Sequence, residues 1–285
     1  MAAEANRTAL PRPLLVFGVP LAGLLLVAFF VYLGFPYHKL GDRIATEIQS
    51  SSGVRIDFED IGASLQLAAP GIEATGVRAT LSDGRSYRIE RAMLRPAWSF
   101  AWFRGTPAIH AEVEIELGDA DGTLLLGHAG GWSGELSQVA VGRIPIPPLS
   151  AIGNIDGRLD ASIDLVLAEA SPEGSIEFAA TEGSVGLAKF PIDIPFETLS
   201  GELIFGGEAF ISIERLELDG PMLTASLTGN VLKAESFAKA PMRLEAELTA
   251  EPNLRPAITS AGVRVDREGK SKVRITGTVE SPMVR

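Results

Sequence analysis

Hydrophobic and polar residues follow two different patterns along this chain. No charged residue interrupts the apolar run from Leu14 to Phe35, whereas from Val54 onward apolar and polar residues alternate. A helix of about 20 apolar residues crosses a hydrocarbon core of roughly 30 Å while satisfying its own backbone groups. The first pattern therefore predicts a membrane anchor over residues 13–36, after a short tail at residues 1–12. The side chains expected to hold it in the membrane are Leu14, Phe17, Leu24, Leu25, Phe29, Phe30, Tyr32 and Phe35.

A cleaved signal peptide is the alternative interpretation of this run. Signal peptides have an apolar core of about 7–15 residues, followed by a small-x-small cleavage site. The run here is longer, and the sequence from Gly34 to Lys39 lacks such a site, which favours an uncleaved anchor. The positive charges on the two sides of the run nearly balance, so the short N-terminal tail gives only a slight preference for an N-terminus in the cytoplasm.

A second helix is predicted over residues 37–53. Leu40, Ile44 and Ile48 are four residues apart and share one helix face, and Gly53 is a typical end. This helix could cap the end of a β domain or lie on the membrane surface. Its polar face is not basic, as that of a surface helix tends to be, and this favours the cap.

The alternating pattern predicts strands with one apolar and one wet face, as in antiparallel sheets. It is clearest at Ala108–Leu117, where every second residue from Ile109 is apolar and His110 and three glutamates stand between. It recurs at residues 158–167, 223–231, 243–250 and 272–279, and a one-residue slip at Glu214-Arg215 predicts a β-bulge. The candidates for an apolar groove on these strands are Ile109, Val113, Ile115, Leu159, Ile163, Leu165, Leu244 and Leu248.

Glycine and proline divide the β region. Glycine phrases at roughly ten-residue spacing are typical of turns in all-β domains; they contain Pro70-Gly71, Gly153, Gly157, Gly174, Gly183, Gly201, Gly220 and Gly229. The proline-rich segment 143–149 lacks ladder donors and predicts a joint between an N-terminal half, 54–142, and a C-terminal half, 150–285. Residues 190–196 predict an edge strand or a connection.

Large aromatic residues concentrate in the segment 95–105. Trp98, Phe100, Trp102 and Phe103 could plug the core at one edge of the sheet, which is the commoner use of such residues. The alternative is an exposed patch for docking a partner or the membrane interface.

Composition excludes several classes of function. A net charge of −11 disfavours binding to nucleic acid, and the absence of cysteine excludes disulfides and thiolate sites. The three histidines lack metal-ligand spacing, and His110 is expected to be solvated on its strand. The stretch Asp119–Gly122 begins like a calcium loop but places Gly130 where a bidentate glutamate is needed, so it predicts a turn. We therefore expect no enzyme, cofactor or metal site.

Several phrases suggest a family. After the anchor come a helix, Ser-Gly, two short strands, Pro-Gly and a longer strand, while Leu33–Tyr37 leads into the helix and Val273–Pro282 closes the chain. This order resembles AsmA-like proteins and the related type II secretion system protein N family. The phrases Leu199–Leu203 and Leu218–Gly229 resemble repeats of the wider AsmA group.

The resemblance implies a mainly β fold: one transmembrane helix, then a large, curved, mostly antiparallel sheet, as an AsmA-like groove or a twisted sandwich, with one capping helix. It also implies a single-pass protein of the bacterial inner membrane with its C-terminal domain in the periplasm. Neither family offers catalytic residues.

Two functions follow from these expectations. The first is a component of the type II secretion system whose β domain docks other secretion components, for example by strand addition. The second is a module that binds or transfers phospholipid in an apolar groove. In a scaffold the apolar strand faces close on one another or on a helix, whereas in a carrier they stay open.

Overall fold

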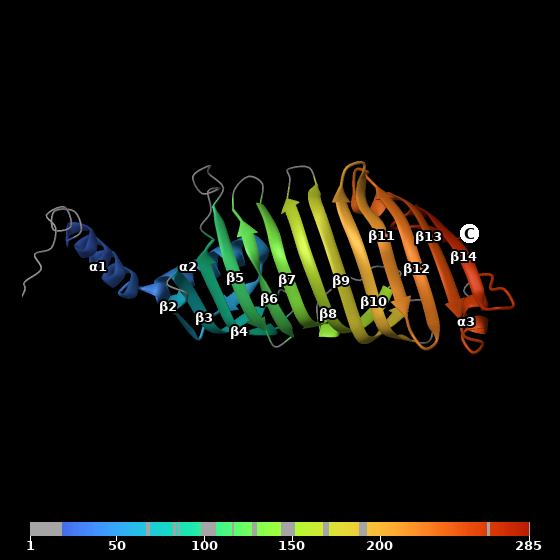
Figure 1. Ribbon diagram of the computed structural model, residues 1–285, viewed down its shortest axis with the longest axis horizontal. Coiled ribbons are helices and arrows are strands. Elements are labelled where there is room, and N and C mark those ends of the chain that lie inside the picture. Colours follow the sequence, from blue (N-terminus) through green and yellow to red (C-terminus); the bar gives the residue numbers. More distant parts are fainter. Residues whose placement is uncertain are drawn as a thin grey trace, which may run out of the picture.

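The strands form a single large sheet. The computed structural model describes residues 19–66, 69–81, 84, 86–97, 107–115, 117–126, 130–143, 152–167, 171–187, 193–260 and 263–284. Within them lies one 15-stranded sheet in which, from β3 onward, each strand pairs with the next in the sequence (Figure 1). The helices are α1 (Val19–Leu33), α2 (Tyr37–Ser52) and α3 (Arg255–Ser260), with 3₁₀ turns η3 (Val141–Arg143) and η4 (Phe237–Lys239).

All strand pairs are antiparallel, and both β1 and β2 pair with β3. The strands are β1 (Arg55–Asp57), β2 (Asp60–Gln66), β3 (Ala69–Thr80), β4 (Ser86–Pro96), β5 (Ala108–Ile115), β6 (Gly118–Leu125), β7 (Gly130–Ala140), β8 (Ile152–Leu167), β9 (Pro172–Leu187), β10 (Ile194–Gly206), β11 (Ala209–Asp219), β12 (Leu223–Leu232), β13 (Pro241–Ala250), β14 (Lys270–Thr278) and β15 (Pro282–Val284). The prediction of a mainly β fold with a large antiparallel sheet is confirmed.

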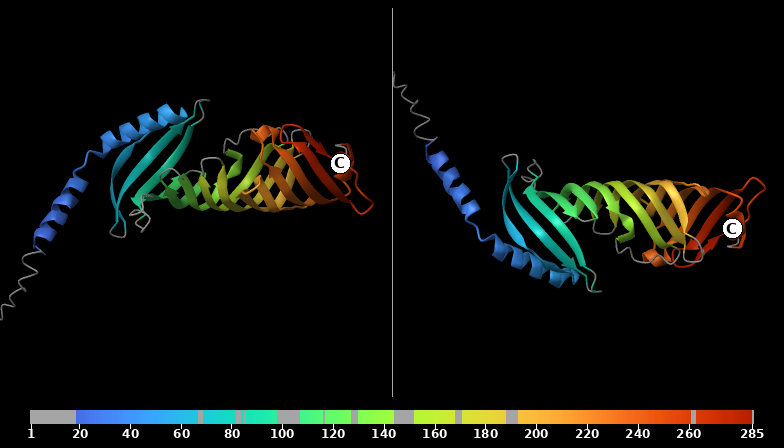
Figure 2. Two further views of the ribbon diagram at one scale, coloured as in Figure 1. Left: turned by 90° about the horizontal axis from the view of Figure 1, so that it is seen from above. Right: turned by 90° about the horizontal axis from the view of Figure 1, so that it is seen from below.

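The helix predicted over residues 37–53 is confirmed as α2, which lies along one face of the N-terminal end of the sheet (Figure 2). It contacts β1 and β2, and Gly41 is buried close to Ile61 and Phe58. Gly53 ends the helix in the left-handed conformation and donates its N–H to Gln49 O, as glycine does in a C-cap. The role of a cap is thus the one that the contacts support. Helix α1 projects away from the sheet (Figure 2).

The predicted bulge at Glu214-Arg215 is also confirmed. Glu202 pairs with Arg215 and Leu203 with Ile213, so Glu214 is the extra residue of β11. The bulge keeps Ile213 and Leu216 on the same face of the sheet, because it absorbs the slip in the alternation.

Most glycines expected at turns lie inside strands instead. Only Gly220 follows the end of a strand, whereas the others belong to β8, β9, β10 and β12. A Cβ on Gly201 would lie 2.7 Å from the ring of its register partner Phe178, and a Cβ on Gly183 would lie 2.4 Å from the ring of its partner Phe196. These glycines make room for an aromatic ring on the neighbouring strand, so they serve packing rather than chain reversal.

Two further expected turns are strands. The stretch Asp119–Gly122 belongs to β6, where Ala120 and Gly122 alternate with the two aspartates. Pro70 and Gly71 belong to β3 and pair with Leu65 and Ser64. Proline is tolerated there because Pro70 precedes the part of β3 that pairs with β4.

The segment predicted to join two halves does not interrupt the sheet. Strand β7 before it pairs directly with β8 after it, so the described strands of both predicted halves share one sheet. Residues 144–151 lie outside the described residues. The segment 190–196 was predicted to be an edge strand or a connection. Its described residues Ile194 and Phe196 are buried at the start of β10. Since β10 pairs with both β9 and β11, it is not an edge strand.

Candidate functional site

One face of the sheet is apolar from end to end. A row of register partners crosses from β2 to β15, and every member is apolar or glycine. In order these are Ala63, Ile72, Leu94, Ala111, Gly122, Gly134, Ile163, Ile176, Leu203, Ile213, Gly229, Leu244, Ile275 and Val284. Neighbouring strands lie about 4.8 Å apart, so such a row is about 60 Å long.

Two parallel rows have the same character. The second runs through Ile61, Ala74, Ala92, Val113, Ala120, Leu136, Ala161, Phe178, Gly201, Leu216, Leu227, Ala246 and Val273. The third runs through Pro96, Ile109, Leu124, Trp132, Leu165, Gly174, Phe205, Ile211, Val231, Met242, Gly277 and Pro282. We call these residues together the apolar face.

The structure brings the predicted groove residues together on this face. Ile163 and Leu244 belong to the first row, Val113 to the second, and Ile109 and Leu165 to the third. Leu159 and Leu248 belong to a shorter fourth row. This row joins Val139, Leu159, Ala180, Leu199, Leu218, Ala225 and Leu248. Ile115 lies outside these rows and pairs with Ile89. Whether these residues line a groove stays a prediction.

Helices cover the apolar face only near its ends, as far as the described residues show. At the C-terminal end, Leu254 and Ile258 of the α3 region are 1% and 6% exposed and pack on Ala250 of β13. Leu254 is the only large side chain that is fully buried among the described residues. Ile163, Ile176 and other large side chains of the central strands are half-buried, and Leu94 and Leu124 are each 40% exposed. A second layer of described residues does not close over the middle of the face.

Two shallow cavities lie along the sheet. One, of about 970 Å³, is lined chiefly by side chains of the opposite, polar face, including Ser200, Glu217, Ser226 and Lys272. The other, of about 340 Å³, is lined by Leu136, Ala161, Phe178 and Gly201 of the second row together with their polar neighbours.

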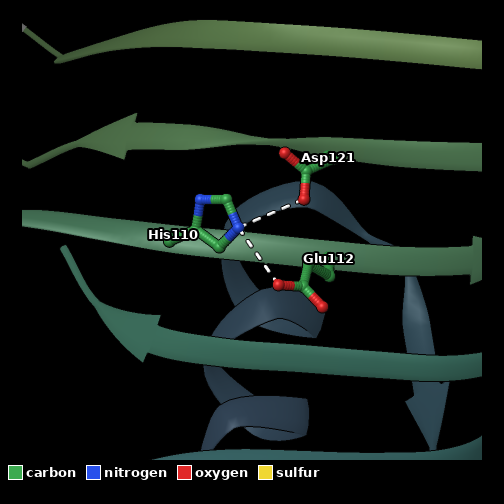
Figure 3. A group of neighbouring side chains, drawn as sticks. All are labelled: His110, Glu112 and Asp121. Atoms are coloured by element: carbon green, nitrogen blue, oxygen red, sulfur yellow. Dashed lines mark hydrogen bonds and ion pairs between the residues drawn. The ribbon is translucent and has the colours of Figure 1, made fainter. Parts of the chain in front are cut away.

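A polar cluster lies on the opposite face of β5 and β6 (Figure 3). The ring Nε2 of His110 is 3.2 Å from Glu112 Oε1 and 3.1 Å from Asp121 Oδ2. His110 was expected to be solvated, but its side chain is only 20% exposed. The sequence pattern did not reveal this cluster. Asp121 is the register partner of Glu112, but the stretch that contains Asp121 was expected to be a turn.

The three donor atoms lie within 4.8 Å of one another, which is close enough to hold a metal ion. Glu112 Oε1 already accepts a hydrogen bond from Arg95 Nη2 at 2.8 Å. A cation there would have to compete with the guanidinium group for this oxygen. The arrangement is thus better suited to fastening β4, β5 and β6 together than to metal binding.

The predicted anchor corresponds in part to α1. Leu24, Leu25, Phe29 and Phe30 are between 44% and 67% exposed on it, and Phe35, which follows it, is 47% exposed. Its 15 residues give a length of about 22 Å. No single helix of the described part is long and apolar enough to cross a membrane. The helical segments Leu21–Leu33 and Tyr37–Thr46 reach the required length and apolar character only as a pair, and the pair is bent by 57°. Leu14 and Phe17 lie outside the described residues.

Tyr32 differs from the other anchor residues because it points at the sheet. Its hydroxyl group donates to Ser64 O at 2.7 Å and lies against Gly71 O, while the N–H groups of Gly71 and Ser64 approach it at 2.9 and 3.1 Å. Ser64 and Gly71 are register partners in β2 and β3. Tyr32 therefore fastens the end of α1 to the sheet.

The aromatic residues Trp98, Phe100, Trp102 and Phe103 lie outside the described residues, in the connection between β4 and β5. Their role as a plug or a docking patch stays a prediction.

No known protein family, curated protein or solved structure matches the chain.

Proposed function

We propose that the chain is a membrane-anchored protein that binds the acyl chains of lipids on its apolar face. One observation carries the proposal: three parallel rows of apolar residues and glycines run across 12 to 14 strands of the sheet, and most of their large members are only half-buried. Contiguous exposed apolar surface of more than a few hundred Å² marks an interaction site in a water-soluble domain.

Acyl chains fit this surface better than a folded partner does. The rows are long and carry no charged side chain, and the indole of Trp132 is their one hydrogen-bonding side chain. Each methylene group that leaves water contributes about 0.8 kcal/mol, so a chain lying along a row gains affinity in proportion to its length. The role is one of binding and requires no catalytic group.

Placement at a membrane belongs to the same proposal. From Leu21 to Val31 the side chains of α1 are apolar and exposed on all sides, as expected of a helix in lipid. With the segment before Val19 included, the apolar run is long enough to span a bilayer. We place it in the bacterial inner membrane with the sheet in the periplasm, as the family resemblance implies.

Photo-crosslinking of the full chain in lipid nanodiscs tests acyl-chain binding. The photoreactive residue p-benzoylphenylalanine would replace Ile163 on the apolar face or, as the matched control, its exposed neighbour Ser162 on the polar face of β8. We expect phospholipid adducts by mass spectrometry at position 163 and none at position 162. Equal adduct yields at both positions, or adducts only to protein at position 163, would refute the proposal.

A role in type II secretion stays a prediction from the sequence resemblance. In a scaffold the apolar strand faces were expected to close on one another or on a helix; the described strands form one sheet, with helices over the apolar face only near its ends. Purification of the full chain from membranes would test it, with secretion components expected to copurify.

A further inference from the structure

The bend between α1 and α2 is fixed to the sheet rather than free. Tyr37 is buried, and its hydroxyl group donates to the backbone oxygen of Tyr32 at 2.7 Å. The two rings meet edge to face with their centroids 6.0 Å apart. Because the Tyr32 hydroxyl also contacts Ser64 and Gly71, the end of α1, the start of α2 and the β2–β3 hairpin form one connected unit. We call this unit the tyrosine joint.

The tyrosine joint brings exposed apolar side chains of different elements to the end of α1. Leu33 and Phe35 are each 47% exposed directly after Tyr32, and Leu65, which follows Ser64 in β2, is 50% exposed. Leu65 points to the same side of β2 as Ile61 and Ala63, because alternate residues of a strand share a face. The apolar face thus begins beside the last turn of α1.

Exposed polar and charged side chains lie next to the joint, where the chain would pass from hydrocarbon to water. His38 and Lys39 follow Tyr37 at once and are exposed, and Arg43 is exposed one turn later. Asp42 offsets part of this charge. Aromatic hydroxyl groups and basic side chains are commonly found at the boundary between hydrocarbon and water.

We infer that the β2–β3 corner of the sheet is seated in the bilayer surface, with Leu65 among the acyl chains at the level where α1 leaves the membrane. The partner is the lipid surface itself. Leu65 lies next to Ser64, which Tyr32 fastens to α1, and α1 enters the membrane in the proposed function. This inference depends on the anchoring of α1 that is part of the proposed function, but not on acyl-chain binding along the rest of the apolar face. Tyr32 acts as a positioning residue that keeps this corner at a fixed depth.

The absence of cysteine from the chain allows a direct test. Single cysteines would carry a nitroxide label in the full chain in nanodiscs, and the depth of each label would be measured from its collision rates with oxygen and with a water-soluble nickel complex. The test position is Leu65. One control is Asp60, exposed at the opposite end of β2, and another is Ser162, which is exposed on the polar face of β8 and distant in the sheet.

We expect the ratio of oxygen to nickel collision rates to be several-fold higher at Leu65→Cys than at Asp60→Cys or Ser162→Cys. A ratio at Leu65→Cys equal to that at Asp60→Cys would overturn the seating. A label at Leu25→Cys in α1 separates this failure from a failure of the anchor. If Leu25→Cys also behaves as an aqueous site, the anchoring in the proposed function is wrong as well.

The substitution Tyr32→Phe tests the joint itself, because it keeps the ring and removes only the hydroxyl group. In the Leu65→Cys background we expect the collision ratio to fall toward that of Asp60→Cys, while the far-ultraviolet circular dichroism of the sheet is unchanged. A merely structural role would alter the circular dichroism or the denaturation midpoint without changing the depth. An unchanged depth would overturn the positioning role of Tyr32.

Discussion

Gly134 lies in β7 directly against the backbone of β6, and its replacement by alanine tests how β6 and β7 pack within the apolar face. Gly134 pairs with Gly122, and both belong to the first apolar row. A Cβ on Gly134 would lie 2.3 Å from Asp121 O and 2.5 Å from Gly122 Cα. Because both contacts are with backbone, no side chain can rotate away, and the two strands must move apart by several tenths of an ångström.

The expected effect follows from two opposing contributions. Overpacking of this kind costs about 1–3 kcal/mol, whereas alanine in place of glycine in a strand contributes up to about 1 kcal/mol through lower chain entropy. We therefore expect Gly134→Ala to lower the free energy of unfolding by about 1–2 kcal/mol. Gly62 in β2 is the matched control because a Cβ there would meet no atom within 4 Å. Gly62→Ala should leave stability unchanged or raise it by up to about 1 kcal/mol.

Urea denaturation of the detergent-solubilised full chain, followed by far-ultraviolet circular dichroism, measures both variants. The midpoint should fall for Gly134→Ala and not for Gly62→Ala, with the same slope as the wild type. A Gly134→Ala protein as stable as the wild type would refute the close approach of β6 and β7. An equal fall for both variants would show that the loss has a cause other than this contact.

Three further predictions concern side chains. Arg95→Met removes the half-buried ion pair with Glu112 at 2.8 Å and should destabilise the protein by about 1–2 kcal/mol. Arg55→Met removes a mostly exposed ion pair with Asp57 and should cost at most about 0.5 kcal/mol. Equal losses of stability for the two variants in urea denaturation would contradict this prediction. The hydrogen bond to a glutamate on β13 raises the pKa of Lys272 above its ordinary value, so its contribution is present at neutral pH and is lost as the pH rises through the raised pKa. The difference in midpoint between wild type and Lys272→Gln should therefore begin to shrink above the ordinary lysine pKa of about 10.4 and vanish once the pH has passed the raised pKa. Leu254→Ala should cost about 2–4 kcal/mol because this side chain is 1% exposed, and Leu65→Ala, at 50% exposed, should cost far less in the same assay.

Local patterns predicted the strands and their sidedness well, because burial on one face of an antiparallel sheet imposes strict alternation. The strand at Ala108–Ile115 and the bulge at Glu214 followed from that rule alone. The glycines inside β9 and β10 could not be interpreted in this way, since their role depends on the rings of Phe178 and Phe196 on neighbouring strands. Register, rather than local sequence, decides which residue faces a glycine.

The parts of the candidate site that were missed are also matters of register and tertiary contact. The cluster of His110, Glu112 and Asp121 required knowing that β6 begins at Gly118. The six residues of α3 are too few to show a helical period. The contact of Tyr32 with Ser64 joins residues that are 32 positions apart, and an apolar helix gives no local sign of which side chain turns toward the sheet.

The order of the strands has a consequence for how such a protein can change in evolution. From β3 onward every strand pairs with its successor. One hairpin could therefore be added or removed without changing how the other strands pair. Insertion or loss of one hairpin would change the length of the sheet by about 10 Å while preserving which side chains face each way. The length of the sheet can thus be adjusted in fixed steps, and a homologue of different length would be expected to differ by pairs of strands.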